Sequence, residues 1–166
     1  GIVLGVILQG IASIVTLNRS REWGAVRTLI LVAVIIPAAW AVEYIGHTTG
    51  FPFGNYFYTE RLQPQFGGVP LLIPFAWLMM LPPAWAAAAL IVGKRGRLAF
   101  LGMTAITFTA WDLFLDPQMV KWDLWVWHDP GTFHYFGIPW SNYAGWMLAA
   151  VAITALAMGI FDRIGH

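Results

Sequence analysis

The sequence predicts an all-α fold: a polytopic helical membrane bundle with about five spans, forming a single helical transmembrane domain over residues 1–166. Hydrophobic residues make up 59% of the chain and charged residues only 10%, whereas about 25% of the residues in a soluble protein are charged. Five apolar runs recur along the chain, each close to the roughly 20 residues that a helix needs to cross hydrocarbon. The net charge is only +1, and no basic tract suggests binding to nucleic acid. The absence of Cys excludes disulfides and thiolate chemistry.

Taken in order, the apolar runs are residues 1–17, 25–44, 71–92, 98–115 and 142–161. The first run has no basic leader, so we interpret it as a span, in a processed chain or a fragment, and not as a signal peptide. In the third run, Pro74 and the pair Pro82-Pro83 predict a kink or a local break, because proline removes a backbone donor. In lipid, neighbouring groups must then satisfy the freed carbonyls, and the break could also open a groove for a substrate.

Basic residues gather in alternate connections. Arg19, Arg21 and Arg27 flank the first connection. The third connection contains Lys94, Arg95 and Arg97, and Arg163 follows the last run. The second and fourth connections contain only one Arg or Lys each, Arg61 and Lys121. The positive-inside rule therefore predicts a cytoplasmic C-terminus and places the two long connections on the outer side.

The two long connections, residues 46–70 and 121–140, are rich in aromatic residues. The segments WVW (125–127) and FHYF (133–136) flank the turn signal Asp129-Pro130-Gly131, so we expect a short β-hairpin there. Aromatic enrichment is ordinary at a membrane interface, but its density here favours a lid or groove wall for an apolar, elongated ligand. Ser141 or Asn142 is expected to cap the last helix.

Three acidic residues lie near the ends of the apolar runs. Asp112 and Asp116, in TAWDLFLD, are four residues apart and so share one face of a helix. Glu43 lies near the end of a different run, with His47 four residues later as a local partner. All three acids belong to spans that run toward the long connections, so we expect them to share the outer half of the membrane. Acidic side chains at such depth in a membrane are costly, so we treat these three as candidate functional residues.

The acids predict proton chemistry on an apolar substrate. Two partly desolvated carboxyls one turn apart cannot both ionise at low cost, so we expect one to stay protonated and to act as a general acid. Protonation of an isoprenoid double bond would give a tertiary carbocation that aromatic faces stabilise. Our hypothesis makes Asp112 the proton donor, with Asp116 or Glu43 positioning and deprotonating water. The expected substrate-binding residues are His47, Tyr56, Tyr58, Trp111, Trp140 and Asn142.

Other uses of the acids stay open. Asp116 precedes Pro117 and could simply end its helix, and Asp112 could make a structural hydrogen bond to another helix. Glu43, His47 and the two aspartates could hold a metal, although no compact ligand motif such as H-E-x-x-H is present. D-x-x-x-D is also used by membrane prenyltransferases to hold magnesium, but a second aspartate-rich motif and a basic clamp are missing here. We therefore expect neither a metal nor a cofactor.

Four segments, EYIGHTTGFPFGNYFYT, GGVPLLIPFAWLMM, TAWDLFLDPQMV and FGIPWSNYAGW, carry a resemblance over roughly residues 40–146. In this order they resemble the membrane carotenoid-biosynthesis family that includes the carotenoid 1,2-hydratases acting on γ-carotene or on bisanhydrobacterioruberin. The resemblance implies cofactor-independent addition of water across the terminal double bond of a carotenoid ψ end group. It also implies that the chain lacks N-terminal spans of a longer family pattern.

The resemblance implies a multi-pass protein of a bacterial or archaeal cytoplasmic membrane, whose partners are a carotenoid and membrane lipid. Two alternatives remain. A carotenoid end-group cyclase would use the same protonation but exclude water, and a non-catalytic carotenoid-binding subunit of a larger pigment-protein complex would bind without turnover.

Overall fold

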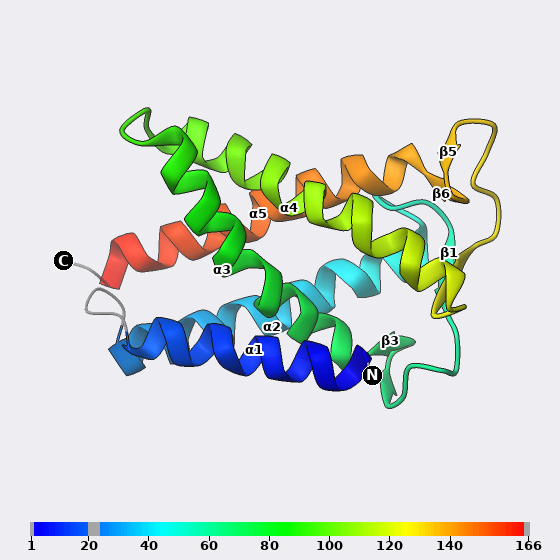
Figure 1. The fold of residues 1–166 in the computed structure, drawn as a ribbon, viewed down its shortest axis with the longest axis horizontal. Helices are drawn as coiled ribbons and strands as arrows, with labels where there is room; N and C mark the ends of the chain where they lie inside the picture. The colour runs from blue at the N-terminus through cyan, green and yellow to red at the C-terminus, as the bar shows by residue number, and fades with distance from the viewer. Residues whose placement is uncertain (1, 20–23, 165–166) are drawn as a thin grey trace.

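In a computed structural model, which describes residues 2–19 and 24–164, the chain forms a helical bundle with short strands gathered at one end (Figure 1). The first residue of the expected first span and the basic residue Arg21 lie outside these ranges. The helices are α1 (Ile2–Arg19), α2 (Gly24–Thr49), α3 (Leu72–Val92), α4 (Arg97–Lys121) and α5 (Trp140–Ile164). The strands are β1 (Tyr56–Tyr58), β2 (Gln65–Phe66), β3 (Val69–Pro70), β4 (Trp125–Trp127), β5 (His134–Tyr135) and β6 (Ile138–Pro139).

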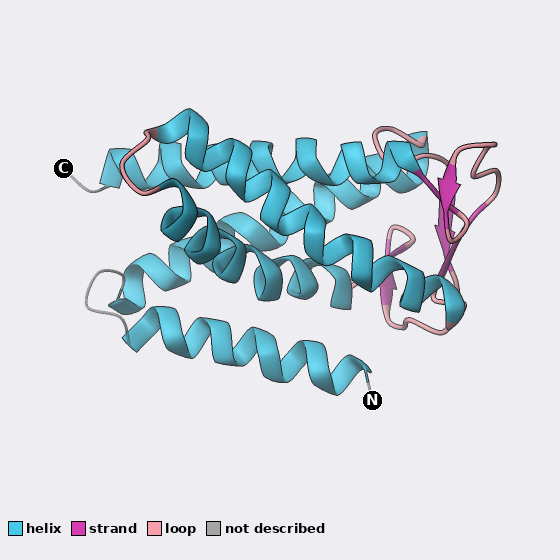
Figure 2. Cartoon of the chain, turned by 45° about the horizontal axis from the view of Figure 1, so that its top comes forward, coloured by secondary structure: helices cyan, strands magenta, loops and turns pink. Residues whose placement is uncertain are grey.

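The expected all-α membrane bundle is confirmed. Within the described ranges, α2, α3, α4 and α5 are long and apolar enough to cross a membrane, and α1 is a shorter apolar helix. The central helix is α3, which packs against α1, α2 and α4, while α5 packs against α4 and α2. Helices cover most of the molecule, and the strands are confined to the end where the two long connections lie (Figure 2). We call this end the strand end.

The helix α3 runs without interruption through Pro82 and Pro83, so the expected local break is wrong. Pro74 lies in the first turn, where a backbone N–H has no partner within the helix. Pro83 cannot donate to the carbonyl of Met79, four residues earlier. The hydroxyl of Ser13, from α1, donates to that carbonyl over 3.4 Å. A neighbouring helix thus supplies a donor that proline removed, and the helix continues.

The strands form three antiparallel pairs. One of these pairs differs from the hairpin that the sequence predicted. The segment WVW, which is β4, pairs with β1 of the other long connection and not with FHYF. A hairpin does form, but between β5 and β6, and its turn residues Phe136 and Gly137 have φ of 53° and 79°, as a type I′ turn requires. At the expected turn, the side chain of Asp129 accepts a bond from the amide of Gly131 over 2.9 Å. That local turn forms without bringing its flanking segments into a ladder.

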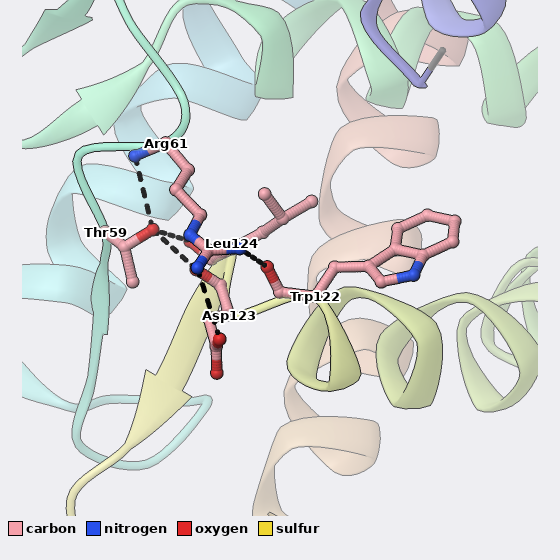
Figure 3. A network of polar contacts seen from close by, with 5 residues as sticks. All are labelled: Thr59, Arg61, Trp122, Asp123 and Leu124. Atoms are coloured by element: carbon pink, nitrogen blue, oxygen red, sulfur yellow. Dashed lines mark hydrogen bonds and ion pairs between the residues drawn. The ribbon is translucent and has the colours of Figure 1, made fainter.

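Polar contacts join the two long connections where β1 ends and β4 begins (Figure 3). The hydroxyl of Thr59 donates to the carbonyl of Asp123 over 2.6 Å, and the guanidinium of Arg61 donates to the carbonyl of Trp122 over 3.0 Å. The ion pair of Arg61 with Asp123, at 3.6 Å, is largely exposed and so contributes little on its own. These bonds to backbone carbonyls hold the segment between α4 and β4 against the residues that follow β1.

The ends of the bundle differ in charge, as the sequence predicted for the two sets of connections. The turn between α3 and α4 and the C-terminal ends of α1 and α5 lie opposite the strand end (Figure 1). That end carries Arg19, Lys94, Arg95, Arg97 and Arg163, whereas Arg61 and Lys121 flank the strands.

Candidate functional site

Glu43 is held inside the bundle by three donors. It lies in the last third of α2 and is only 3% exposed. One carboxylate oxygen accepts the indole N–H of Trp77, from α3, over 2.9 Å. The other accepts the hydroxyls of Tyr56 and Tyr58, from β1, each over 2.7 Å. Three neutral donors thus stabilise a buried acceptor, and within the described part of the chain Glu43 forms no ion pair.

Both tyrosines are kept as donors by their surroundings. Burial raises the pKa of Tyr56 well above its ordinary value, and the charge of the Glu43 carboxylate raises this pKa further. The pKa of Tyr58 is raised by the same two causes, burial being the larger. Neither phenol therefore loses its proton at neutral pH, and both can donate to Glu43.

Asp112 and Asp116 form a second acidic group, on α4. Both are buried, with exposures of 0% and 1%, and their carboxyls are close enough to interact electrostatically. The amide of Asn142 donates to Asp116 over 2.6 Å and to Asp112 over 3.3 Å. Trp125 lines the same cavity as Asp116. Because two neighbouring buried carboxyls repel when both are charged, this pair is suited to hold one proton between them.

Asn142 reaches the aspartates because α5 starts earlier than expected. The helix begins at Trp140, directly after β6, so Ser141 and Asn142 both lie in its first turn and neither is the residue before it. The prediction that one of them caps the helix is wrong. The side chain of Asn142 instead points across to α4, and it is 2% exposed.

Between the two acidic groups lies a small cavity of about 40 Å³. Its polar lining comes from Glu43, Asp116, Asn142, Tyr56 and Tyr58. The rest of its lining is mostly aromatic: Phe53, Trp77, Trp125, Trp127 and Trp146. A water needs about 10–15 Å³ of such volume, so the cavity has room for about three waters beside the carboxyls.

The pairing of β1 with β4 closes this cavity. Tyr56 lies opposite Trp127, and Tyr58 lies opposite Trp125. Because alternate strand residues share one face, these four rings point inward together, and all four line the cavity. The two long connections thus form a common lid over the acids.

Phe53 fills the space between this lid and the helices because two glycines leave room for it. A Cβ on Gly145, in α5, would lie 2.7 Å from the Phe53 ring and 3.0 Å from the backbone of Pro52. A Cβ on Gly46, in α2, would also collide with that ring. Below Phe53, the rings of Trp77 and Trp146 stack with centroids 4.8 Å apart.

The structure brings most of the predicted site residues together. Glu43, Asp116, Tyr56, Tyr58 and Asn142 line one cavity, and Asp112 adjoins it through its contact with Asp116. His47 lies just outside, with its ring centroid 6.4 Å from those of Tyr56 and Tyr58.

Two predicted wall residues lie elsewhere. Trp111 is 43% exposed and lines a separate groove between α3 and α4, and Trp140 is 49% exposed and lines a groove between α4 and α5. Both project from the outside of the bundle. Within the described ranges, no group of three or more His, Asp or Glu side chains is arranged to hold a metal ion.

Sequence reasoning missed the two tryptophans that stack beneath the acids, Trp77 and Trp146. Both stand in segments that carried the family resemblance, PFAWLMM and NYAGW. No acid neighbours either of them in the sequence, and only the packing of α2, α3 and α5 brings them to the site. Tyr143, next to Asn142, was also missed.

The fold and the site define a class of protein: a helical membrane protein with three buried carboxyls beneath an aromatic lid. The chain matches the carotenoid biosynthesis protein family over residues 1–165 and belongs to that family. A curated relative, the bisanhydrobacterioruberin hydratase of Haloarcula japonica, is 33% identical over 141 residues. The match covers 82% of this chain and 46% of the relative, so the chain spans about half of that protein's length. No solved structure gives a significant match.

Proposed function

We propose that this chain hydrates a carotenoid, adding water to the terminal 1,2 double bond of a linear or monocyclic ψ end group by acid catalysis. The observation that carries the proposal is a small, mostly aromatic cavity lined by two buried carboxyls, Glu43 and Asp116, with the buried Asp112 one helical turn from Asp116. Membership of a carotenoid biosynthesis family and a relative named as a hydratase support the same reaction.

In the proposed reaction, Asp112 gives its proton to C2 of the end group, and the double bond becomes a tertiary cation at C1. A water from the cavity attacks C1 and loses a proton to Asp116. Contact between the two aspartates returns this proton to Asp112, so the net change is the addition of one water. Asp116 suits the part of base better than Glu43, because three hydrogen bonds already occupy the oxygens of Glu43.

Glu43 has a separate part in this scheme. As a fixed negative charge inside a low-dielectric site, it stabilises the developing cation, and its three donors hold it in place. The faces of the tryptophans beneath the cavity add cation–π stabilisation. The cavity also favours hydration over cyclisation, because it has room for water beside Glu43 and Asp116.

For orientation, we place the strand end on the outer side of a bacterial or archaeal cytoplasmic membrane and the C-terminus in the cytoplasm. The support is the accumulation of basic residues at the opposite end of the bundle. We further take the whole chain, residues 1–166, as one transmembrane domain.

The test is pigment analysis of a bacterial host that makes lycopene or γ-carotene, with and without this chain. A new pigment heavier by one water is the expected product. Unchanged mass with a shifted absorption spectrum would instead indicate a cyclase. Carotenoid retained on the purified protein without any new product would indicate a pigment-binding subunit of a larger complex.

Asp112→Asn tests the assignment of the acid. Asn keeps the shape of the side chain but cannot supply the proton, so the variant should bind pigment and form no product. Asp162→Asn is the matched control: Asp162 is exposed and pairs with Arg97 at the other end of the bundle. Full turnover by Asp112→Asn would refute the assignment.

A further inference from the structure

A second hollow lies on the outside of the bundle, within one helical turn of Asp112. Helices α4 and α5 enclose a groove of about 390 Å³, roughly ten times the volume of the central cavity. Its lining includes Ile106, Thr109, Leu113, Trp140, Tyr143 and Met147. Ile106, Trp140 and Met147 are each more than a third exposed, so the groove opens on the surface that faces lipid.

The inner wall of this groove carries polar groups that lack partners. Thr109 is 6% exposed and Tyr143 is 4% exposed, and neither hydroxyl has a hydrogen-bond partner in the described part of the chain. One carboxyl oxygen of Asp112, Oδ1, is likewise buried and unpartnered. Buried polar groups are nearly always hydrogen-bonded. Three buried polar atoms without partners in one region therefore indicate a place where a ligand binds or reacts.

One aspartate of the pair lines the cavity, and the other is one helical turn from a residue that lines the groove. Asp116 lines the cavity together with Asn142, whereas Thr109 and Tyr143 line the groove. Asp112 is one turn from Thr109 and one turn from Asp116 on the same helix, and its carboxyl group and that of Asp116 both act electrostatically on the phenol of Tyr143. Asp112 is 0% exposed and lines neither hollow. The groove nevertheless offers room for a branched hydrocarbon within one helical turn of Asp112, while Asp116 lines the room for water.

We propose that the α4–α5 groove binds the terminal isoprenoid unit of the polyene, and that Tyr143 is the residue that positions this unit against Asp112. This inference rests on the proposed hydration and assigns the route of the apolar substrate. Thr109 and Tyr143 have no partners before the reaction because the alkene offers none. The tertiary hydroxyl of the product supplies one, since it can both donate to and accept from these hydroxyls.

The groove is tested with substitutions that fill it. Ala144→Leu and Ala110→Leu add bulk to its lining, at positions that are exposed and so leave the interior unchanged. Ala87→Leu is the matched control, because Ala87 lines the separate groove between α3 and α4 that holds Trp111. We expect a loss of product of at least tenfold in the first two variants and none in the control.

Binding is measured apart from turnover. The chain has no Cys, so Leu148→Cys gives a unique position for a fluorescent label, because Leu148 is 52% exposed and follows the groove residue Met147 without lining the groove itself; Ala87→Cys gives its control. Lycopene added to the protein in detergent should quench the label at position 148 and leave the label at position 87 nearly unchanged, and the quenching should disappear when Ala110→Leu is added.

Tyr143→Phe tests the positioning role. It keeps the ring contacts with Trp140 and Tyr135 and removes only the hydroxyl. Product formation should fall at least tenfold while lycopene quenching at position 148 is unchanged. Tyr135→Phe is the control, since Tyr135 is 38% exposed and does not line the groove.

The outcomes separate this inference from the function on which it rests. Specific quenching at position 148 without any hydrated product would keep the groove as a carotenoid site and overturn the hydratase. Hydration that is lost in Asp112→Asn but unaffected by Ala144→Leu and Ala110→Leu would keep the hydratase and overturn the groove. Full activity in Tyr143→Phe would overturn the role of Tyr143.

Discussion

Removal of the two tyrosine hydroxyls that share one oxygen of Glu43 should destabilise the protein more than the two single changes together. Tyr56 and Tyr58 each donate to that oxygen over 2.7 Å. A hydrogen bond to a charged group contributes roughly 1.5–3 kcal/mol, so Tyr56→Phe and Tyr58→Phe should each cost about 2 kcal/mol. In either single variant, the remaining tyrosine still satisfies the oxygen.

The double variant leaves that oxygen buried without a donor. Its cost should exceed the sum of the single costs by about 1 kcal/mol or more, because the second loss exposes an uncompensated charge. For a chain of this size, 1 kcal/mol corresponds to roughly 2–4 °C in the midpoint of thermal unfolding. We therefore expect apparent shifts of about 4–8 °C for each single variant and more than about 10 °C for the double variant.

The assay is thermal unfolding of the purified protein in detergent, followed by intrinsic fluorescence. Tyr44→Phe serves as control, since Tyr44 is 40% exposed and its replacement should cost less than about 0.5 kcal/mol. If the single variants behave like the control, or if the two costs simply add, Glu43 is not held as a charged acceptor in the way described.

Three further predictions concern pH and packing. The pKa values of Tyr56 and Tyr58 are raised above 10.0 in the folded protein. Their contribution to stability should therefore be constant below pH 10 and fall as the pH rises further. When the unfolding midpoint is measured against pH, the double Phe variant should lose less stability at alkaline pH than the unsubstituted protein. Gly145→Ala should lower the unfolding midpoint by several degrees, since its Cβ would meet both a ring and the backbone of Pro52, whereas Gly102→Ala, which meets nothing within 4 Å, should not. Ser13→Ala should cost about 1 kcal/mol by leaving the Met79 carbonyl without its donor, and an unchanged midpoint would show that this bond contributes nothing.

The spans and the acidic pair could be predicted because both follow from local patterns. A run of about 20 apolar residues is a helix wherever it meets lipid, since every backbone group must be satisfied within the segment. The spacing of Asp112 and Asp116 places them on one face of any helix. Even so, the prediction for α3 was wrong in part, because the donor for Met79 comes from Ser13, 66 residues earlier.

The pairing of the strands could not be read in the same way. A turn signal at Asp129-Pro130-Gly131 favoured a hairpin from neighbouring segments, and the local turn did form. The strand β4 nevertheless pairs with β1, about 70 residues away. A two- or three-residue strand has little preference of its own, so the partner is decided by which faces can be buried over the acids.

By itself, the sequence determined the solvent, the helices and the chemical type of the site, because hydropathy and helical spacing act within one segment. Tertiary structure alone decided that Trp77 and not Trp111 meets the carboxyls, and that Asn142 bridges two aspartates instead of capping its own helix. Which side of a helix faces the interior, and what it meets there, depends on the neighbours of that helix in space. Those neighbours are set by the packing of the whole bundle.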